Sequence, residues 1–298
     1  LPDVVAGFQL VKGFLNLTLT PGYWLGFLRT VAGRPDFYQA DWAAGQTVMV
    51  EFCSPNTNKP LHLGHLRNIF LGDALSRILA AVGYKVVRAC LFNDKGIHIC
   101  KSMLAYDELG GGKTPQELGM KGDHLAGHFY VEFDKLYRAE IAEMVMQGAP
   151  EDMAKEHAPI YRAAQELYRQ WEADDPEALA LWRKMNAWVY EGFRETFTAL
   201  GVTFDQYYYE SETWTLGREE VLKGLAQDVF YQRPDGSVWI DLTDAKLDEK
   251  LLLRRDGTSV YITQDIGTAE LKYQQYGLDR SIYVIGNEQD YHMKVLIE

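Results

Sequence analysis

Two histidines separated by two residues make up the stretch with the clearest chemical meaning. His62-Leu63-Gly64-His65 lies between a pattern typical of a buried strand and a helical spacing of apolar residues. Backbone N–H groups at the start of a helix favour anions such as phosphate, and Gly64 lets a base or a phosphate approach closely. Imidazoles one turn apart can donate hydrogen bonds to phosphate oxygens whose charge grows during transfer. The pattern therefore predicts a nucleotide site at His62, Gly64 and His65.

Such a site needs no nucleophilic side chain of its own. A carboxylate substrate can itself attack the α-phosphate of ATP, so that catalysis consists of positioning and electrostatic stabilisation. Lys59 precedes the first histidine by three residues and is a candidate to neutralise phosphate charge, although a solvated side chain is an equal interpretation. The histidines also fit incidental positions in a loop and a helix cap. Their place between a strand and a helix favours the nucleotide site.

A sheet and a helix must hold these residues. Residues 47–53 (TVMVEFC) and 85–92 (KVVRACLF) predict strands, and residues 64–82 predict a helix that Gly83 ends. Strand, helix and strand in succession indicate a βαβ unit and a parallel sheet. Residues 13–20 alternate as a separate half-buried strand does.

In the rest of the chain, the predicted secondary structure changes at two places, near residue 113 and near residue 200. Residues 113–200 predict several helices inserted into the sheet domain. A β-rich segment follows, with turns at Asp235-Gly236 and Asp256-Gly257, a helix over 266–276 and a further helix up to the last residue. Its predicted strands are residues 201–205, 237–241, 259–263 and 281–285. The expected division of the chain is 1–45, 46–112, 113–200 and 201–298.

Composition limits the broad class. The chain has 298 residues, of which 47% are hydrophobic and 24% charged, which is typical of a globular protein with one large or two ordinary domains. No window approaches eighteen uninterrupted apolar residues, so no membrane span is expected. The cysteines Cys53, Cys90 and Cys100 fit neither a disulfide framework nor a common zinc pattern, which predicts a cytoplasmic protein without a protein-ligated metal. The net charge of −12 counts mildly against a nucleic-acid partner without excluding one.

Longer stretches resemble one family. Residues 51–67 (EFCSPNTNKPLHLGHLR), 72–74 (GDA), 93–98 (NDKGIH), 261–265 (YITQD) and 282–292 (IYVIGNEQDYH) are similar to signature stretches of arginyl-tRNA synthetases, and they occur in the order of that family. The HxGH (HIGH) motif alone is shared with other class I aminoacyl-tRNA synthetases and with nucleotidyltransferases. The resemblance runs from about residue 8 to the last residue and so covers nearly the whole chain.

The resemblance implies a set of substrate-binding residues. A guanidinium is planar, always charged and best held by carboxylates, and the resemblance places Glu51 and Asp265 around it. Tyr261 would contribute its ring face or hydroxyl, and Ser54 and Asn56 would hold the ammonium or carboxylate of the substrate. The resemblance also assigns Gln289 to the amino acid, and Gly286, Gln289 and His292 to the nucleotide.

Each of these residues has a plainer interpretation. Glu51 also fits a solvated charge at a strand end, and Asp265 fits a helix N-cap. Tyr261 fits a core aromatic residue, and Asn56 fits a turn.

The family implies an activity and a fold. The activity would be a ligase reaction of protein biosynthesis: adenylation of L-arginine with ATP and Mg²⁺, then transfer to tRNA(Arg), by a cytoplasmic monomer. The fold would be α/β, a Rossmann-like parallel sheet with a helical insertion and a small β-rich segment, preceded by the tail of an N-terminal α+β tRNA-binding domain. The family also has a KMSKS-like loop and an anticodon-binding domain, which the sequence lacks, so this piece is expected to be inactive alone. The alternatives are another class I synthetase, a nucleotidyltransferase using the same HxGH motif, and a non-catalytic paralogue.

Overall fold

The computed structural model describes residues 3–298, in two compact units. One unit comprises the residues up to 46 together with 78–85, and the other comprises 47–77 and 86–298. The first two residues of the expected segment 1–45 lie outside the described residues.

The smaller unit contains a hairpin and a helix. Strands β1 (Val5–Val11) and β2 (Phe14–Leu19) pair antiparallel, so the strand expected over 13–20 is the second of a pair. Helix α1 (Pro21–Ala32) follows at once, and Thr20 caps it by accepting a hydrogen bond from the Tyr23 amide.

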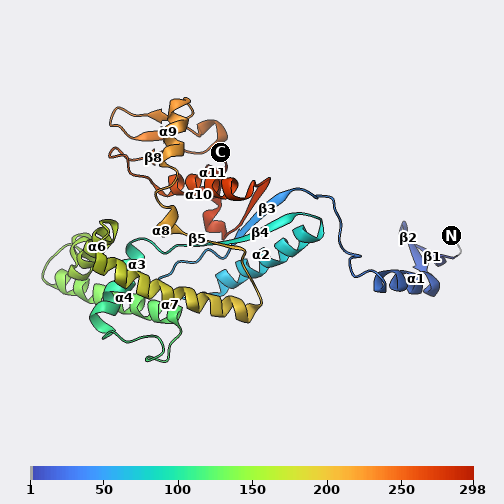
Figure 1. Cartoon of the computed structure of the whole chain (residues 1–298), viewed down its shortest axis with the longest axis horizontal. Helices are drawn as coiled ribbons and strands as arrows, with labels where there is room; N and C mark the ends of the chain where they lie inside the picture. Colours follow the sequence, from blue (N-terminus) through green and yellow to red (C-terminus); the bar gives the residue numbers. More distant parts are fainter. Residues whose placement is uncertain (1–2) are drawn as a thin grey trace. The chain divides into compact units, whose positions relative to one another are not determined.

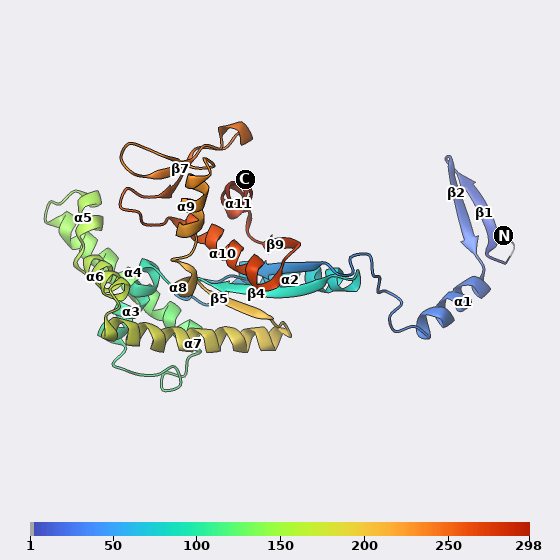
Figure 2. The ribbon, with the colours of Figure 1, turned by 45° about the horizontal axis from the view of Figure 1, so that its top comes forward.

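The larger unit is built on a four-stranded sheet with the order β5-β4-β3-β9. Its strands are β3 (Thr47–Phe52), β4 (Lys85–Phe92), β5 (Gln206–Tyr209) and β9 (Arg280–Val284). The pairs β3–β9 and β4–β5 are parallel. Helix α2 (Leu63–Ala81) connects β3 to β4 and lies along the sheet (Figure 2). The fold is therefore α/β and Rossmann-like, as the sequence predicts.

Close packing fixes α2 on the sheet. A side chain at Gly72 would place its Cβ 2.2 Å from Cγ of the Phe52 ring, so only glycine allows this approach of α2 to β3. Ile69, on the same helix, is fully buried. This contact fixes the middle of α2 against β3, and the HxGH motif lies at the first turn of the same helix.

Five helices pack against one another in the same unit (Figure 1), and four of them form a separate apolar core. Met103, Phe129, Phe133, Ile160 and Met185 are among its buried side chains. The helices are α3 (Ile97–Leu109), α4 (Gly122–Met146), α5 (Glu151–His157), α6 (Pro159–Glu172) and α7 (Pro176–Leu200). Since α3 shares this core, helical structure begins well before residue 113.

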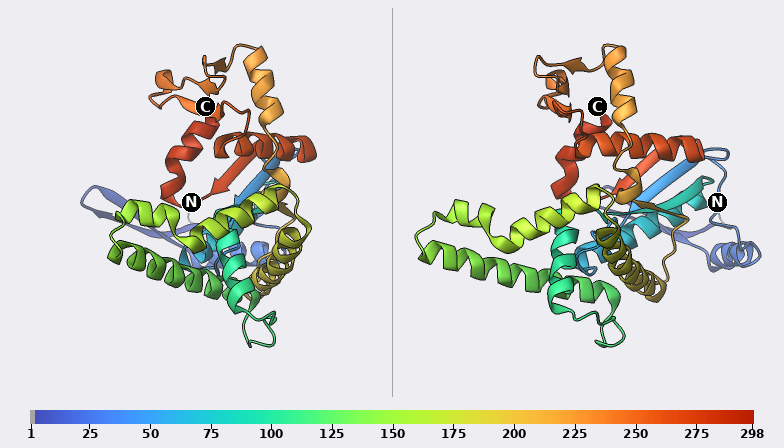
Figure 3. Two further views of the ribbon diagram at one scale, coloured as in Figure 1. Left: turned by 90° about the vertical axis from the view of Figure 1, so that its left-hand side faces the viewer. Right: turned by 60° about the vertical axis from the view of Figure 1, so that its left-hand side comes forward.

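A small β-rich part completes the unit. Strands β6 (Tyr231–Gln232), β7 (Val238–Ile240) and β8 (Lys250–Leu253) form an antiparallel sheet in that order. Figure 3 shows helices α9 and α10 beside it. The helices of this part are α8 (Glu210–Thr213), α9 (Arg218–Ala226), α10 (Tyr261–Tyr276) and α11 (Asp290–Ile297), with short 3₁₀ turns at Thr243–Ala245 and Asn287–Gln289.

Two predicted strands are wrong. Residues 201–205 form the exit from α7, because Gly201 adopts a left-handed conformation (φ 67°) that caps the helix, and pairing with β4 begins only at Gln206. Residues 259–263 contribute one isolated bridge at Ser259. The carbonyl of Val260 then accepts the amide of Thr263, so α10 begins at Tyr261 rather than at 266. Local β-propensity gave way to tertiary packing at both places.

Candidate active site

Many of the candidate residues follow the carboxyl ends of the parallel strands. The segments that leave β3, β4, β5 and β9 all begin at this edge of the sheet, because the paired strands run in the same direction. Ligands of open α/β sheets bind at such an edge. The HxGH motif follows β3, and Gly286, Gln289 and His292 follow β9.

A tight turn leads from β3 towards the motif. Cys53 and Ser54 both have positive φ angles (75° and 41°), an uncommon conformation for residues other than glycine. Asn93, at the end of β4, holds the turn: its side-chain amide donates to the Ser54 carbonyl at 3.2 Å, and its backbone amide donates to the Pro55 carbonyl at 3.0 Å. Strain held by neighbouring contacts is typical of functional loops.

The two histidine rings of the motif pack against one another, with an angle of 35° between their planes. Their ring centres lie 3.9 Å apart. The Gly64 amide donates to Nδ1 of His62, and the His62 amide donates to Nδ1 of His65, each at 3.1 Å. In a neutral ring, an Nδ1 that accepts a hydrogen bond leaves the proton on Nε2. Both imidazoles therefore offer an Nε2–H donor, as the phosphate role requires. The Gly64 amide, by contrast, is occupied by His62 and is not free for phosphate.

The pKa of His65 is lowered to about 4, first by burial and then by the charges of His62 and Lys59. Between this pKa and the ordinary 6.5, the unfolded chain binds more protons at this residue than the folded chain does. The stability contributed by neutral His65 is therefore lost as the pH falls from 6.5 through about 4.

We expect the ring of His65 to remain neutral in solution at pH 6. An NMR titration of the histidine ring carbons should show little change for His65 above pH 5 and a midpoint near 4. Replacing Lys59 with methionine should raise that midpoint, because a nearby positive charge is removed. A midpoint near 6.5 in the unmodified protein would contradict the packing described for this ring.

Glu51 is buried and paired rather than solvated. The residue is 8% exposed, and its Oε2 accepts a hydrogen bond from Nζ of Lys272 on α10. Its other oxygen, Oε1, lies 3.5 Å from the Ser54 hydroxyl. The pKa of Lys272 is lowered by burial, but attraction to Glu51 and Tyr283 outweighs this, so that the net shift is upward. The ammonium group of Lys272 is therefore charged at neutral pH.

Asp265 contacts His292. Its Oδ2 lies 2.5 Å from Nε2 of the histidine, and this contact raises the pKa of His292. Asp265 is the fifth residue of α10, whose N-cap is Val260, so the N-cap interpretation of Asp265 is wrong. The structure thus joins His292, expected beside the nucleotide, to a carboxylate expected beside arginine.

Most of the remaining candidates are exposed. Tyr261 is 74% exposed, which removes the interpretation as a core aromatic residue. It stands one turn before Asp265 on α10, so the two share a helix face. Asn56 and Gln289 are exposed, and Gly286 is half-buried. These side chains are free to meet a ligand.

Sequence reasoning missed three charged residues at this edge. Lys272 is the buried partner of Glu51. Asp94, at the end of β4, is fully buried and accepts hydrogen bonds from Tyr190 and Ser211. Glu210 follows β5, and burial together with the charges of Asp94 and Asp265 raises its pKa to about 7, although Lys95 opposes the shift. A correctly placed β5 would have pointed to Glu210, since it directly follows that strand.

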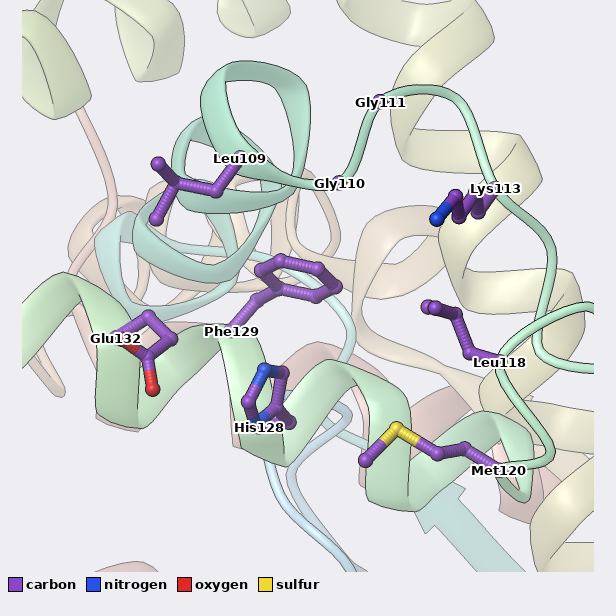
Figure 4. A pocket seen from close by; sticks show the side chains of 9 residues that line it. All are labelled: Leu109, Gly110, Gly111, Lys113, Leu118, Met120, His128, Phe129 and Glu132. Atoms are coloured by element: carbon purple, nitrogen blue, oxygen red, sulfur yellow. The ribbon is translucent and has the colours of Figure 1, made fainter.

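Two cavities lie away from the motif. One, of about 420 Å³, is lined by residues of α3, α4 and the loop between them, among them Leu109, His128 and Phe129 (Figure 4). The other, of about 440 Å³, lies between α9, α10, α11 and β9. None of the candidate residues lines either of these two cavities.

Neither a metal cluster nor a membrane helix is found among residues 3–298. Within that range no group of three or more His, Cys, Asp or Glu side chains is arranged to hold a metal ion. In the same residues, every helix is too short or too polar to cross a membrane. The three cysteines are free and buried.

Comparison with known proteins gives consistent matches. Residues 33–297 match the family model described as tRNA synthetases class I (R), catalytic domain. The chain is 53% identical over 294 residues to an arginine–tRNA ligase of Amoebophilus asiaticus, covering 99% of this chain and 49% of that protein. It is 52% identical over 293 residues to the ligase of that name from Bacteroides thetaiotaomicron, covering 98% and 49%. The chain spans about half the length of the curated relatives it matches.

Solved structures agree with these matches. The arginyl-tRNA synthetase of Thermus thermophilus superposes with a TM-score of 0.63 at 28% identity, over 90% of this chain and 42% of that one. The enzyme from Plasmodium falciparum gives a TM-score of 0.64 at 17% identity, over 99% and 48%. The second likeness shows the fold alone.

Proposed function

Because the chain belongs to the family of class I (R) tRNA synthetase catalytic domains, we propose that it is the part of an arginine–tRNA ligase that binds L-arginine and ATP. In the complete protein, the arginine carboxylate would attack the α-phosphate of ATP and release pyrophosphate. A ribose hydroxyl of tRNA(Arg) would then attack the arginyl carbonyl and release AMP. The complete protein would work as a monomer in the cytoplasm.

The observation that carries the proposal is that two groups of side chains, one suited to phosphate and one acidic, lie at the same edge of the sheet. The adjacent His62 and His65 rings offer Nε2–H donors, with Lys59 close enough to lower the pKa of His65. Such donors suit the oxygens of ATP, whose charge shifts during transfer. Because these Nε2–H groups donate hydrogen bonds rather than ligate metals, Mg²⁺ would be held by the ATP phosphates.

The other group of side chains is acidic and suits the guanidinium. Asp265 and Glu210 lie close enough for Asp265 to raise the pKa of Glu210. Lys272 links Glu51 to this acidic group, because the charges of Glu51 and Asp265 both raise the pKa of Lys272. We propose that Asp265 and Glu51 hold the guanidinium, with Tyr261 against its face. Ser54, Asn56 and Gln289 would bind the amino-acid end, and Gly286 and His292 would lie beside the nucleotide.

Calorimetric titration of this chain should show binding of arginine and of ATP. Arginine is expected to bind at least ~10-fold more tightly than lysine, because a carboxylate holds a guanidinium through two parallel hydrogen bonds and an ammonium through one. Tighter binding of another amino acid would favour a different class I synthetase. Binding of ATP without any amino acid would favour a nucleotidyltransferase, and binding of neither would favour a non-catalytic paralogue.

A further inference from the structure

Lys272 places an ammonium group deep inside the larger unit. The residue is 2% exposed, and its Nζ donates a hydrogen bond to Oε2 of Glu51, which lies 221 residues away in the chain. An unpaired charge at such depth is strongly unfavourable. The ammonium group of Lys272 therefore depends on Glu51 as its partner in the interior.

Two tyrosine rings fix the position of that ammonium group. Nζ lies 5.3 Å from the ring centre of Tyr208 on β5 and 5.1 Å from that of Tyr283 on β9. Ring faces attract cations at such distances. Tyr283 is also the register partner of Glu51 in the parallel pair β3–β9. Rings from two strands thus hold the cation beside the carboxylate.

The contact with Lys272 leaves one oxygen of Glu51 available. Oε1 lies 3.5 Å from the hydroxyl of Ser54, which is longer than a good hydrogen bond between oxygens. Ser54 belongs to the turn that leaves the carboxyl end of β3. With Oε2 held by Lys272, Oε1 therefore faces the edge at which the proposed substrate binds.

Lys272 and Asp265 lie on the same face of α10. They are seven residues apart, about two helical turns, and the charge of Asp265 is among those that keep Lys272 protonated. One helix thus carries a carboxylate proposed to hold the guanidinium and, two turns further on, the cation that fixes the second carboxylate.

We infer that Lys272 is a positioning residue for arginine recognition: it anchors Oε2 of Glu51 so that Oε1 meets the guanidinium beside Asp265. The inference rests on the proposed function. Lys272 itself does not touch the substrate and acts only through Glu51. A buried ion pair can also be purely structural, so the test must separate the two roles.

The test is a double-mutant cycle in arginine binding. The variants are Lys272→Met, Glu51→Gln, the combination of both, and Lys272→Arg, with Lys223→Met as a control on the exposed side of α9. Affinities for arginine and ATP are measured by calorimetry, and folding is monitored by thermal unfolding. The combined variant leaves no unpaired charge in the interior, so it keeps the test informative if Lys272→Met alone unfolds.

We expect Lys272→Met to weaken arginine binding at least 10-fold with ATP affinity unchanged, and Lys272→Arg to restore most of the loss. The combined variant should bind arginine no more weakly than Glu51→Gln alone, because Lys272 acts through Glu51. Unchanged arginine affinity in a folded Lys272→Met protein, or losses that multiply in the combined variant, would overturn the inference. If the unmodified chain binds ATP but no arginine, the proposed function fails first, and the inference with it.

Discussion

Asp265→Asn is expected to weaken arginine binding by roughly 30-fold to several thousand-fold, or about 2–5 kcal/mol. The amide keeps the size of the side chain but loses its charge, and it can present only one acceptor to a guanidinium that offers two parallel donors. Glu51 cannot replace it, because Lys272 already balances the charge of that carboxylate. Calorimetric titration with arginine measures the loss.

Two controls separate this loss from misfolding. Glu270→Gln removes the same charge from the same helix and should leave arginine affinity unchanged, because Glu270 accepts a hydrogen bond from Gln274 and is not among the proposed substrate-binding residues. In the Asp265→Asn protein, the pKa of His292 should also fall, because its hydrogen bond to the carboxylate raises that pKa. An Asp265→Asn protein that binds arginine like the unmodified chain would remove Asp265 from the proposed site.

The sequence predicted the elements around the motif because their signals are local. The apolar run of 47–53 and the helical spacing of 64–82 correspond to β3 and α2. The turn signals Asp235-Gly236 and Asp256-Gly257 correspond to real turns, in which each aspartate accepts an amide two residues later and each glycine has a positive φ. The parallel sheet then follows from the order of strands and helices.

Partners far apart in the chain could not be predicted. The pairing of Glu51 with Lys272 depends on how α10 packs on the sheet, and no local pattern in either segment contains that information. A weak signal existed, since Lys272 lies two turns after Asp265 on one helix face. The misplaced start of α10 concealed it, because residues 259–263 alternate in the way a strand does although they lead into a helix.

The partners of Asp94, where the sheet meets the inserted helices, could not be predicted from the sequence either. Its carboxylate accepts hydrogen bonds from the Tyr190 hydroxyl at 2.6 Å, the Ser211 amide at 2.8 Å and the Ser211 hydroxyl at 2.7 Å. Its backbone carbonyl accepts the indole N–H of Trp182 at 2.7 Å. One residue at the end of β4 thus joins α7 and α8. In the sequence it appears only as one of many aspartates.

The neighbouring lysine strengthens this junction. Lys95 Nζ donates to the Tyr168 hydroxyl at 2.8 Å and to Glu172 at 3.0 Å, and it lies 3.7 Å from the ring centre of Trp214. Tyr168 and Glu172 belong to α6, and Trp214 directly follows α8. The dipeptide Asp94-Lys95, which follows β4, therefore joins the sheet to α6, α7 and α8.

Asp94→Ala is expected to destabilise the larger unit by about 3–5 kcal/mol, because it leaves the buried donors of Tyr190 and Ser211 without an acceptor. Asp94→Asn should cost less, since its amide oxygen still accepts the Ser211 amide and both hydroxyls can turn to accept from its NH₂ group. Asp107→Ala, at an exposed position of α3, should change stability by no more than ~0.5 kcal/mol. Urea unfolding followed by tryptophan fluorescence measures all three, since Trp182 contacts Asp94 directly. If Asp94→Ala were no less stable than Asp107→Ala, the hydrogen bonds of Asp94 would not contribute to stability, and apolar contacts alone would join the sheet to the helices.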